Sequence, residues 1–217
     1  MRARFTVAEV RARAIEIVDR DGLGALSMRS LAAALGTGPM TVYNYVKDRD
    51  ELEGLIAEAV LADVVLPPQA ADWAEDVKAV ATAVWESLRR HRNAAPLVLA
   101  RRTVSSEGFA PAERLILALR HGGLTDRDLL AAFRGILSLI IGAAQVELAG
   151  PAGEPDPEQA NALAARHIGA LAGEEHPQLA TLAATSRQST MAADFNRALD
   201  MLLAGVQACV EVPKHRR

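Results

Sequence analysis

Polar side chains that can bind nucleic acid are concentrated in one short stretch, residues 39–47. Both tyrosines of the protein lie in it, two residues apart. Hydroxyl, amide and ammonium groups of this kind can bind phosphate oxygens or the edges of bases. The side chains concerned are Thr41, Tyr43, Asn44, Tyr45 and Lys47.

Two short helices are expected to position these side chains. Ser27 can cap a first helix over 28–35, whose apolar residues recur at helical spacing, and Gly36 can end it. Pro39 suits the first turn of a second helix that reaches about Tyr45. This is helix-turn-helix spacing, in which the second helix enters the DNA major groove. Short helix pairs with a glycine turn also occur in proteins that bind no DNA, so packing alone is an alternative.

The distribution of charge favours nucleic-acid binding by the N-terminal part. Residues 1–50 hold eight Lys/Arg and six Asp/Glu, a net charge of +2. The remaining residues hold sixteen and twenty-one, a net charge of −5. The cationic part of the chain therefore coincides with the part that would have to bind phosphate.

The whole chain is expected to be all-α, with an N-terminal helix-turn-helix domain and a larger helical domain for ligand binding and dimerisation. Ala, Leu, Arg and Glu are abundant, and alternating strand patterns are nearly absent. Pro67-Pro68 breaks the helical pattern, which predicts domains over 1–66 and 67–217. The expected helices cover 7–21, 28–35, 39–45, 48–66, 73–92, 95–100, 111–121, 126–149, 158–172, 178–185 and 190–211.

The helix expected over 126–149 is apolar on more than one side. One stripe contains Leu129, Phe133, Ile136, Ile140 and Ala144, and a second contains Leu130, Leu137 and Ile141. One stripe can face the core or a pocket, and the other can face a partner. The final helix offers Phe195, Leu199, Leu202, Val206 and Val210. The alternative is that both stripes belong to the core of one monomer.

Catalysis, metal binding and a membrane anchor find no support in the sequence. Cys209 is the only cysteine, the five histidines lack ligand spacing, and no catalytic constellation can be defined. We therefore expect no enzyme activity, no catalytic residue, no cofactor and no metal, and we expect the histidines to serve at the surface or in packing. The most apolar stretch, 135–146, is twelve residues long, whereas a bilayer span needs about 20. A cytoplasmic protein is the expectation.

From Phe5 to about Val64 the sequence resembles the N-terminal domain of the tetracycline-repressor (TetR) family of transcription regulators. The resemblance is carried by a first helix ending in Asp21-Gly22 and by "ALSMRSLAAALGTGPMTVYNYVKDRDEL" at 25–52. It implies that Arg29 contacts a base or phosphate, that Thr41 and Tyr43 contact phosphate or a thymine methyl, and that Tyr45 and Lys47 contact the DNA backbone. Asn44 occupies a base-reading position. Pro39 and Met40 depart from the family's polar residues there, so apolar contact with thymine methyls is expected; Met40 packing is the alternative.

Residues 70–150 resemble the second domain of the tetracycline-binding members more weakly, through Asp72-Trp73, His91-Arg92 and the segment 97–102. If the match is ungapped, the Asn that grips tetracycline falls at Val80, the metal-binding His at Val98 and a Thr at Arg101. Tetracycline–magnesium is therefore not expected to bind. The resemblance implies a less polar effector, bound near Val80, Val84 and Val98, with Arg101 or Arg102 available for an anionic group.

The resemblance implies a ligand-responsive transcriptional regulator, most simply a repressor. It would bind a palindromic double-stranded DNA operator as a homodimer, formed through helices at about 126–149 and 190–211, and a small-molecule effector would release it. The alternative is a helical small-molecule-binding or interaction protein without operator binding.

Overall fold

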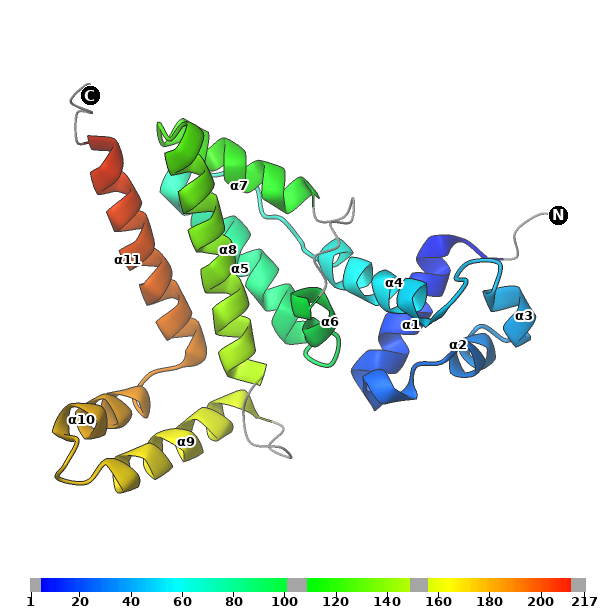
Figure 1. The fold of residues 1–217 in the computed structure, drawn as a ribbon. Helices are drawn as coiled ribbons and strands as arrows, with labels where there is room; N and C mark the ends of the chain where they lie inside the picture. Colours follow the sequence, from blue (N-terminus) through cyan, green and yellow to red (C-terminus); the bar gives the residue numbers. More distant parts are fainter. Residues whose placement is uncertain (1–4, 101–108, 149–155, 212–217) are drawn as a thin grey trace. The chain divides into compact units, whose positions relative to one another are not determined.

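The computed structural model describes residues 5–100, 109–148 and 156–211, and every regular element within them is a helix (Figure 1). The expected all-α fold is confirmed. The helices are α1 (Val7–Asp21), the short 3₁₀ turn η1 (Leu23–Ala25), α2 (Met28–Ala34), α3 (Pro39–Val42), α4 (Arg49–Ala62), α5 (Trp73–Arg90), α6 (Ala95–Ala100), α7 (Phe109–His121), α8 (Asp126–Leu148), α9 (Pro157–Ala172), α10 (Pro177–Ser186) and α11 (Met191–Glu211).

The chain divides into two compact units. Unit 1 comprises Met1–Gln69 and Thr82–Leu117, and unit 2 comprises Ala70–Ala81 and Ala118–Arg217. The boundary between the units therefore falls inside α5 and inside α7. The first part of α5 and the last part of α7 belong to unit 2, and the rest of both helices belongs to unit 1. This division by compactness differs from the predicted functional division into 1–66 and 67–217, which stays a prediction.

Unit 1 is organised around α1, whose buried residues Val10, Ala14, Ile17 and Val18 follow the expected helical stripe. Helix α1 packs against α4 and α2, and α2 packs against α3. The core is completed by aliphatic side chains that are at most 1 % exposed, namely Leu26, Leu31, Val42, Val46, Leu52, Ile56 and Val60.

The starts of the first helices follow the capping signals in the sequence. The Thr6 hydroxyl accepts a hydrogen bond from the Glu9 N–H at 3.1 Å, and the Glu9 carboxylate accepts one from the Thr6 N–H at 2.7 Å. Ser27 caps α2 through Ser30 in the same reciprocal way. Asp48 caps α4 through the Glu51 N–H. The return bond at α4 is displaced by one residue, because the Glu51 carboxylate accepts from the N–H of Lys47.

Removal of the α1 cap is expected to destabilise unit 1. Thr6→Ala should lower the free energy of unfolding by about 1 kcal/mol, because an N-terminal N–H loses its acceptor. Hydrogen bonds from the Thr6 N–H and hydroxyl lower the pKa of the Glu9 carboxyl. A lowered folded-state pKa stabilises the fold above the ordinary glutamate pKa, and this stabilisation is lost as the pH falls through the folded value. Thermal unfolding followed by circular dichroism at pH 7 and between pH 5 and 3 checks both effects.

The control for the predicted loss of stability at acidic pH is Glu9→Gln, which removes the titrating group and keeps the side-chain length. The difference in melting temperature between wild type and Glu9→Gln should shrink as the pH falls from 5 to 3. A difference that stays constant over this range would mean that the Glu9 cap does not titrate in the folded protein.

Three predicted helix ends lie too far along the chain. Helix α3 ends at Val42 rather than at Tyr45, because the next N–H groups, of Asn44 and Tyr45, bond three residues back. Helix α4 ends at Ala62 rather than at about 66. The Asp63 carboxylate and carbonyl there accept hydrogen bonds from Arg90, at 3.1 and 2.9 Å. Helix α5 likewise ends at Arg90 rather than at 92.

In unit 2, α8 and α11 lie side by side, and α9 and α10 form a helical hairpin (Figure 1). The two stripes of α8 differ in burial as predicted. Ile136, Ile140 and Ala144 are at most 2 % exposed, whereas Leu130 and Ile141 are 47 % and 38 % exposed. Leu129, Phe133 and Leu137 are half-buried. The C-terminal part of the first stripe therefore belongs to the core, and Leu130 and Ile141 of the second are open to solvent in the single chain.

Helix α8 is longer and more apolar than the uninterrupted stretch considered in the sequence. Over Asp126–Glu147 its length and mean hydropathy of 1.8 are sufficient for a membrane span, although such a helix is weak evidence for one. The twelve-residue run without charges therefore underestimates the apolar length of this helix. A second explanation for an exposed apolar helix is contact with another protein chain.

Candidate nucleic-acid interface

The turn between α2 and α3 has the geometry of a helix-turn-helix. Gly36 ends α2 with a φ of +63°, a conformation that glycine adopts without steric cost, and the Thr37 N–H returns to the Ala32 carbonyl at 2.9 Å. Gly38 then stands at the N-cap of α3 and Pro39 at its first position. The fully buried side chain of Val42 anchors α3 to the core of unit 1.

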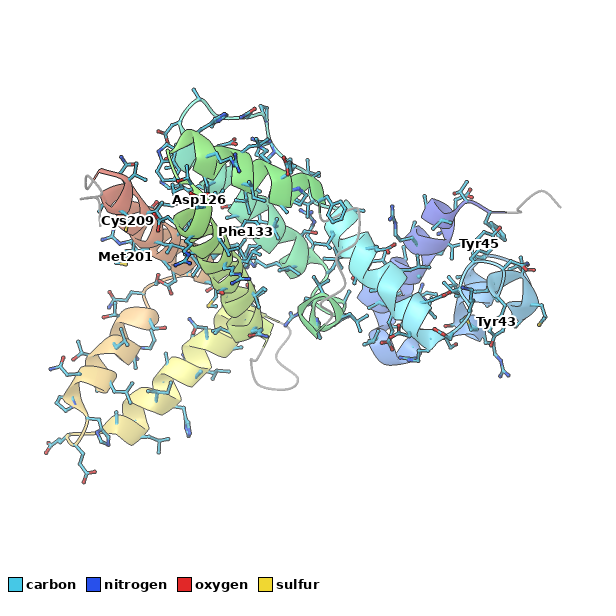
Figure 2. The ribbon with its side chains drawn as sticks, turned by 45° about the horizontal axis from the view of Figure 1, so that its top comes forward. Tyr43, Tyr45, Asp126, Phe133, Met201 and Cys209 are labelled. Carbon is cyan, nitrogen blue, oxygen red and sulfur yellow. The ribbon has the colours of Figure 1, made fainter. Side chains whose placement is uncertain are left out.

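Several other side chains of α3 and the turn after it are open to solvent. Met40 is 78 % exposed and Tyr43 is 46 % exposed. Figure 2 shows Tyr43 and Tyr45 beside α3. A methionine this exposed is not packed within the single chain, so core packing does not account for Met40. The remaining exposed residues of the predicted DNA-binding set are Arg29, Pro39, Asn44 and Lys47.

Thr41 differs from these neighbours because it is half-buried and hydrogen-bonded. Its hydroxyl oxygen accepts a hydrogen bond from the Thr37 hydroxyl at 3.0 Å. The Thr41 N–H donates to the Gly38 carbonyl, also at 3.0 Å. Thr41 is therefore held in place by the turn that precedes α3.

Tyr45 is engaged within the protein itself. Its hydroxyl accepts a hydrogen bond from the Phe5 N–H at 2.8 Å and donates one to the Phe5 carbonyl at 2.9 Å. The two rings are tilted by 60°, with their centroids 6.4 Å apart. Tyr45 thus connects Phe5, two residues before the start of α1, to the turn that follows α3. A phosphate contact by this hydroxyl, as the resemblance implies, would have to replace one of these two bonds.

Lys47 is the single cation of residues 39–47 and is highly exposed. Its side chain is 84 % exposed, and its ammonium lies 3.3 Å from the Glu51 carboxylate. An ion pair this exposed contributes little to stability, so it offers little resistance to exchange for a phosphate.

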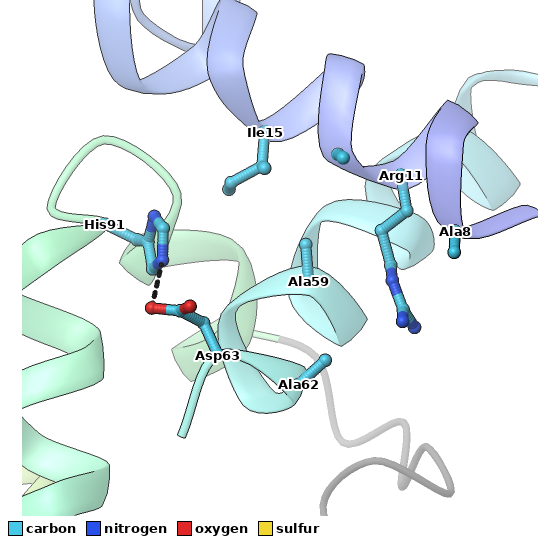
Figure 3. Close-up of a pocket in the computed structure, with 8 residues that line it drawn as sticks. Ala8, Arg11, Ile15, Ala59, Ala62, Asp63 and His91 are labelled. Carbon is cyan, nitrogen blue, oxygen red and sulfur yellow. Dashed lines mark hydrogen bonds and ion pairs between the residues drawn. The ribbon is translucent and has the colours of Figure 1, made fainter. Parts of the chain in front are cut away.

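A histidine that sequence reasoning assigned to the surface or to packing joins three helices of unit 1. His91 follows α5 and is only 13 % exposed. Its Nδ1 lies 2.8 Å from an Asp19 carboxylate oxygen of α1. Its Nε2 lies 3.2 Å from the carboxylate of Asp63 at the end of α4 (Figure 3). The Asn93 amide donates to the carbonyls of Val18 and Asp19, each at 3.1 Å. No spacing signal reveals this cluster, because its members are 28 to 72 residues apart.

The same part of unit 1 contains a shallow groove of about 240 Å³ between α1 and α4 (Figure 3). None of the residues predicted to bind an effector lines it. It is lined by Ala8, Arg11, Ala12, Ile15, Ala59, Ala62, Asp63 and His91.

The predicted effector residues are not gathered in one unit of the structure. Val80 is fully buried and belongs to unit 2, whereas Val84 and Val98 are half-buried and belong to unit 1. Arg101 and Arg102 lie outside the described residues. Within the described part of the chain, no group of three or more His, Cys, Asp or Glu side chains could hold a metal ion.

An all-helical chain that carries a helix-turn-helix near its N-terminal end belongs to the class of helix-turn-helix proteins. Residues 66–210 match the family described as "Tetracyclin repressor-like, C-terminal domain". The chain belongs to the tetracycline-repressor (TetR) family. Members of this family are soluble, bind DNA operators and small-molecule effectors, and act as dimers.

Two curated relatives and one solved structure illustrate the similarity. The transcriptional repressor DrrR1 of Streptomyces coeruleorubidus is 32 % identical over 66 % of this chain and 54 % of its own length. The class E tetracycline repressor of Escherichia coli is 26 % identical over 68 % of this chain and 71 % of its own length. The TetR family protein ActR of Streptomyces coelicolor, in complex with actinorhodin, is 28 % identical over 96 % of this chain and 98 % of its own, with a TM-score of 0.81.

Proposed function

We propose that this protein is a ligand-responsive transcriptional repressor that binds a palindromic operator as a homodimer and leaves it when a small molecule binds. The observation that carries the proposal is the contrast within α3. Val42 fixes the short helix to the core, while Met40, Tyr43 and the following Asn44 stay exposed. Exposed apolar, phenol and amide groups beside Arg29 and Lys47 are the groups that contact phosphates and base edges. The two curated relatives named above are repressors, which supports regulation rather than catalysis.

DNA contacts can be assigned by chemistry. We propose that Lys47, Thr41 and Tyr43 bind the backbone, and that Asn44 and Arg29 face base edges, since an amide can bond adenine through two atoms. Pro39 and Met40 offer apolar contact to thymine methyls. Tyr45 is also proposed to contact the backbone, with its ring held in place by the hydrogen bonds between its hydroxyl and Phe5.

The dimer is proposed to form through the exposed sides of α8 and α11. Leu130 and Ile141 on α8 and Met201 on α11 are 38–62 % exposed in the single chain. A two-fold axis brings the same surface of both subunits together. Two reading helices must then lie about 34–36 Å apart to enter successive major grooves. An effector that favours another spacing lowers operator affinity.

The effector is proposed to be a largely apolar or amphipathic organic molecule. Val80, Val84 and Val98 are the proposed contacts, and Arg101 or Arg102 is available for one anionic group. Aliphatic Val98, where a metal ligand would be needed, argues against magnesium-chelated tetracycline. ActR, a relative of similar fold, binds actinorhodin, which supports an organic ligand in this fold.

A thermal-shift screen of chemically diverse small molecules is expected to identify such an effector. A ligand at 100 times its Kd stabilises the folded state by about 2.7 kcal/mol, which raises the melting temperature measurably. The rise should occur without magnesium, and the same compound should release bound DNA. Tetracycline with and without magnesium is the matched negative control. If DNA release required tetracycline together with magnesium, the assignment of Val80 and Val98 would be wrong.

The experiment that tests the proposed function is a gel shift with DNA from upstream of the protein's own gene. Retarded DNA that survives an excess of random competitor supports an operator-binding regulator. If this and other candidate operator fragments bind no better than random DNA, the alternative of a small-molecule-binding or interaction protein without operator binding is favoured. Cytoplasmic localisation belongs to the same proposal, because the operator is chromosomal DNA.

A further inference from the structure

The turn between α2 and α3 contains a hydroxyl pair that links the two helices. Thr37 is fixed at the end of α2, since its N–H bonds the Ala32 carbonyl and Gly36 before it adopts a φ of +63°. From this position the Thr37 hydroxyl donates to the Thr41 hydroxyl at 3.0 Å. The side chain of Thr41 on α3 is therefore oriented by a group that belongs to the end of α2.

The two threonines of α10 use their hydroxyl protons differently. In α10, Thr181 donates to the Pro177 carbonyl at 2.9 Å and Thr185 donates to the Thr181 carbonyl at 3.1 Å. Bonding to the carbonyl four residues back is a common choice for threonine in a helix. Thr41 departs from it, because its oxygen acts as the acceptor and its proton meets no acceptor among the described residues. Its hydroxyl proton is thus available to an external group.

This direction of hydrogen bonding suits a phosphate. The oxygens of a DNA phosphodiester only accept hydrogen bonds, so a hydroxyl must donate in order to bind one. A donor to the Thr41 oxygen also polarises its O–H bond and strengthens the bond that it makes in turn. If the pair were reversed, the Thr41 proton would be used inside the protein.

We propose that Thr37 is a positioning residue for DNA binding, which orients the Thr41 hydroxyl as a donor to a backbone phosphate. This inference rests on the proposed function, because it assumes that α3 contacts DNA. The helix spans only Pro39–Val42, and Gly38 at its N-cap has no side chain that could cap it. The Thr37 hydroxyl does not cap α3, but its bond to the Thr41 hydroxyl is a side-chain link between the end of α2 and this short helix.

The test is a double-mutant cycle with Thr37→Val, Thr41→Val and the double variant, measured by fluorescence anisotropy on operator and on random DNA. Thr37→Val keeps the shape of the side chain and removes the donor. We expect it to weaken binding about five- to tenfold per dimer, equally on both DNAs, as for the loss of one neutral hydrogen bond at each half-site. The double variant should bind like Thr41→Val alone, and Thr37→Ser should restore wild-type affinity.

The salt dependence separates this role from a charged contact. A hydroxyl releases no counterion, so the log–log salt slope of Thr37→Val should equal that of wild type. Wild-type affinity for Thr37→Val, additive effects in the double variant or a failure of Thr37→Ser to restore binding would each overturn the proposal while leaving the proposed function intact. A wild-type protein that binds neither DNA would overturn both. If Thr37→Val lowers the melting temperature by several degrees, Thr37→Ala takes its place in the cycle, and the same outcomes decide.

Discussion

Replacement of Met201 by glutamate is expected to convert the dimer into a monomer and to abolish tight operator binding. Met201 is 62 % exposed on α11 in the single chain, on the side proposed to face the partner (Figure 2). In a two-fold interface, two glutamates would be desolvated without a counter-charge, which costs several kcal/mol. Since 1.4 kcal/mol is a factor of ten, a cost of about 4 kcal/mol weakens dimerisation about a thousandfold. Light scattering should report about 23.1 kDa for the variant and twice that mass for wild type.

Leu203, two residues further along, provides the matched control. The sequence alone suggests Leu203 as a position at the dimer seam and leaves open whether it lies on the interface side, but Leu203 is only 4 % exposed within the single chain. Leu203→Glu should therefore lower the melting temperature strongly, whereas Met201→Glu should keep its helical circular dichroism. Met201→Leu should remain a dimer. A Met201→Glu protein that is still dimeric at micromolar concentration shows that the exposed side of α11 is not the interface.

The second large effect is expected for Asn44, which we assign to base readout. Asn44→Ala should cost about 1–3 kcal/mol per half-site on operator DNA and have little effect on random DNA, because amide contacts to base edges carry sequence information. For a symmetric dimer the two half-sites together amount to about 2–6 kcal/mol. Titration of both DNAs at several salt concentrations measures this difference.

Lys47→Ala is the complementary variant, because the Lys47 ammonium is highly accessible and forms only an exposed ion pair with Glu51 within the described chain. It should weaken binding to operator and random DNA alike. The log–log salt slope should flatten by roughly one unit for each phosphate that the variant no longer neutralises, about two for the dimer. If Asn44→Ala instead weakens both DNAs equally, Asn44 is a backbone contact or a fold residue, and base readout by this face of α3 has to be abandoned.

The local structure of this protein could be predicted from its sequence because the interactions concerned are local. Capping by Thr6 and Ser27 joins residues three apart, and Gly36 and Pro39 act through their own backbone restrictions. The all-α fold and the helix-turn-helix follow from these signals and from apolar spacing. The two-sided pattern of α8 is also confirmed, since Ile136 and Ile140 are buried while Ile141 is exposed.

The C-terminal ends of some helices could not be predicted correctly from the sequence. Helix α4 ends at Ala62, and four residues separate it from Pro67-Pro68. The reason is a contact made across 27 residues, in which Arg90 binds the Asp63 carboxylate and carbonyl. A proline marks the latest point at which a helix must end, whereas a tertiary hydrogen bond decides where it does end.

The surroundings of individual residues at the candidate site are set by tertiary structure. The resemblance implies that Tyr45 contacts the DNA backbone, and the structure adds that its hydroxyl bonds Phe5, 40 residues away. His91 has no ligand spacing in the sequence, yet it lies between Asp19 and Asp63. Leu203 and Met201 are both apolar residues of one helix, and only packing buries the first and exposes the second. Periodicity and capping depend on neighbours within about four residues. The contacts of Tyr45 and His91 and the burial of Leu203 depend instead on which distant segments pack together, and the folded chain as a whole determines that packing.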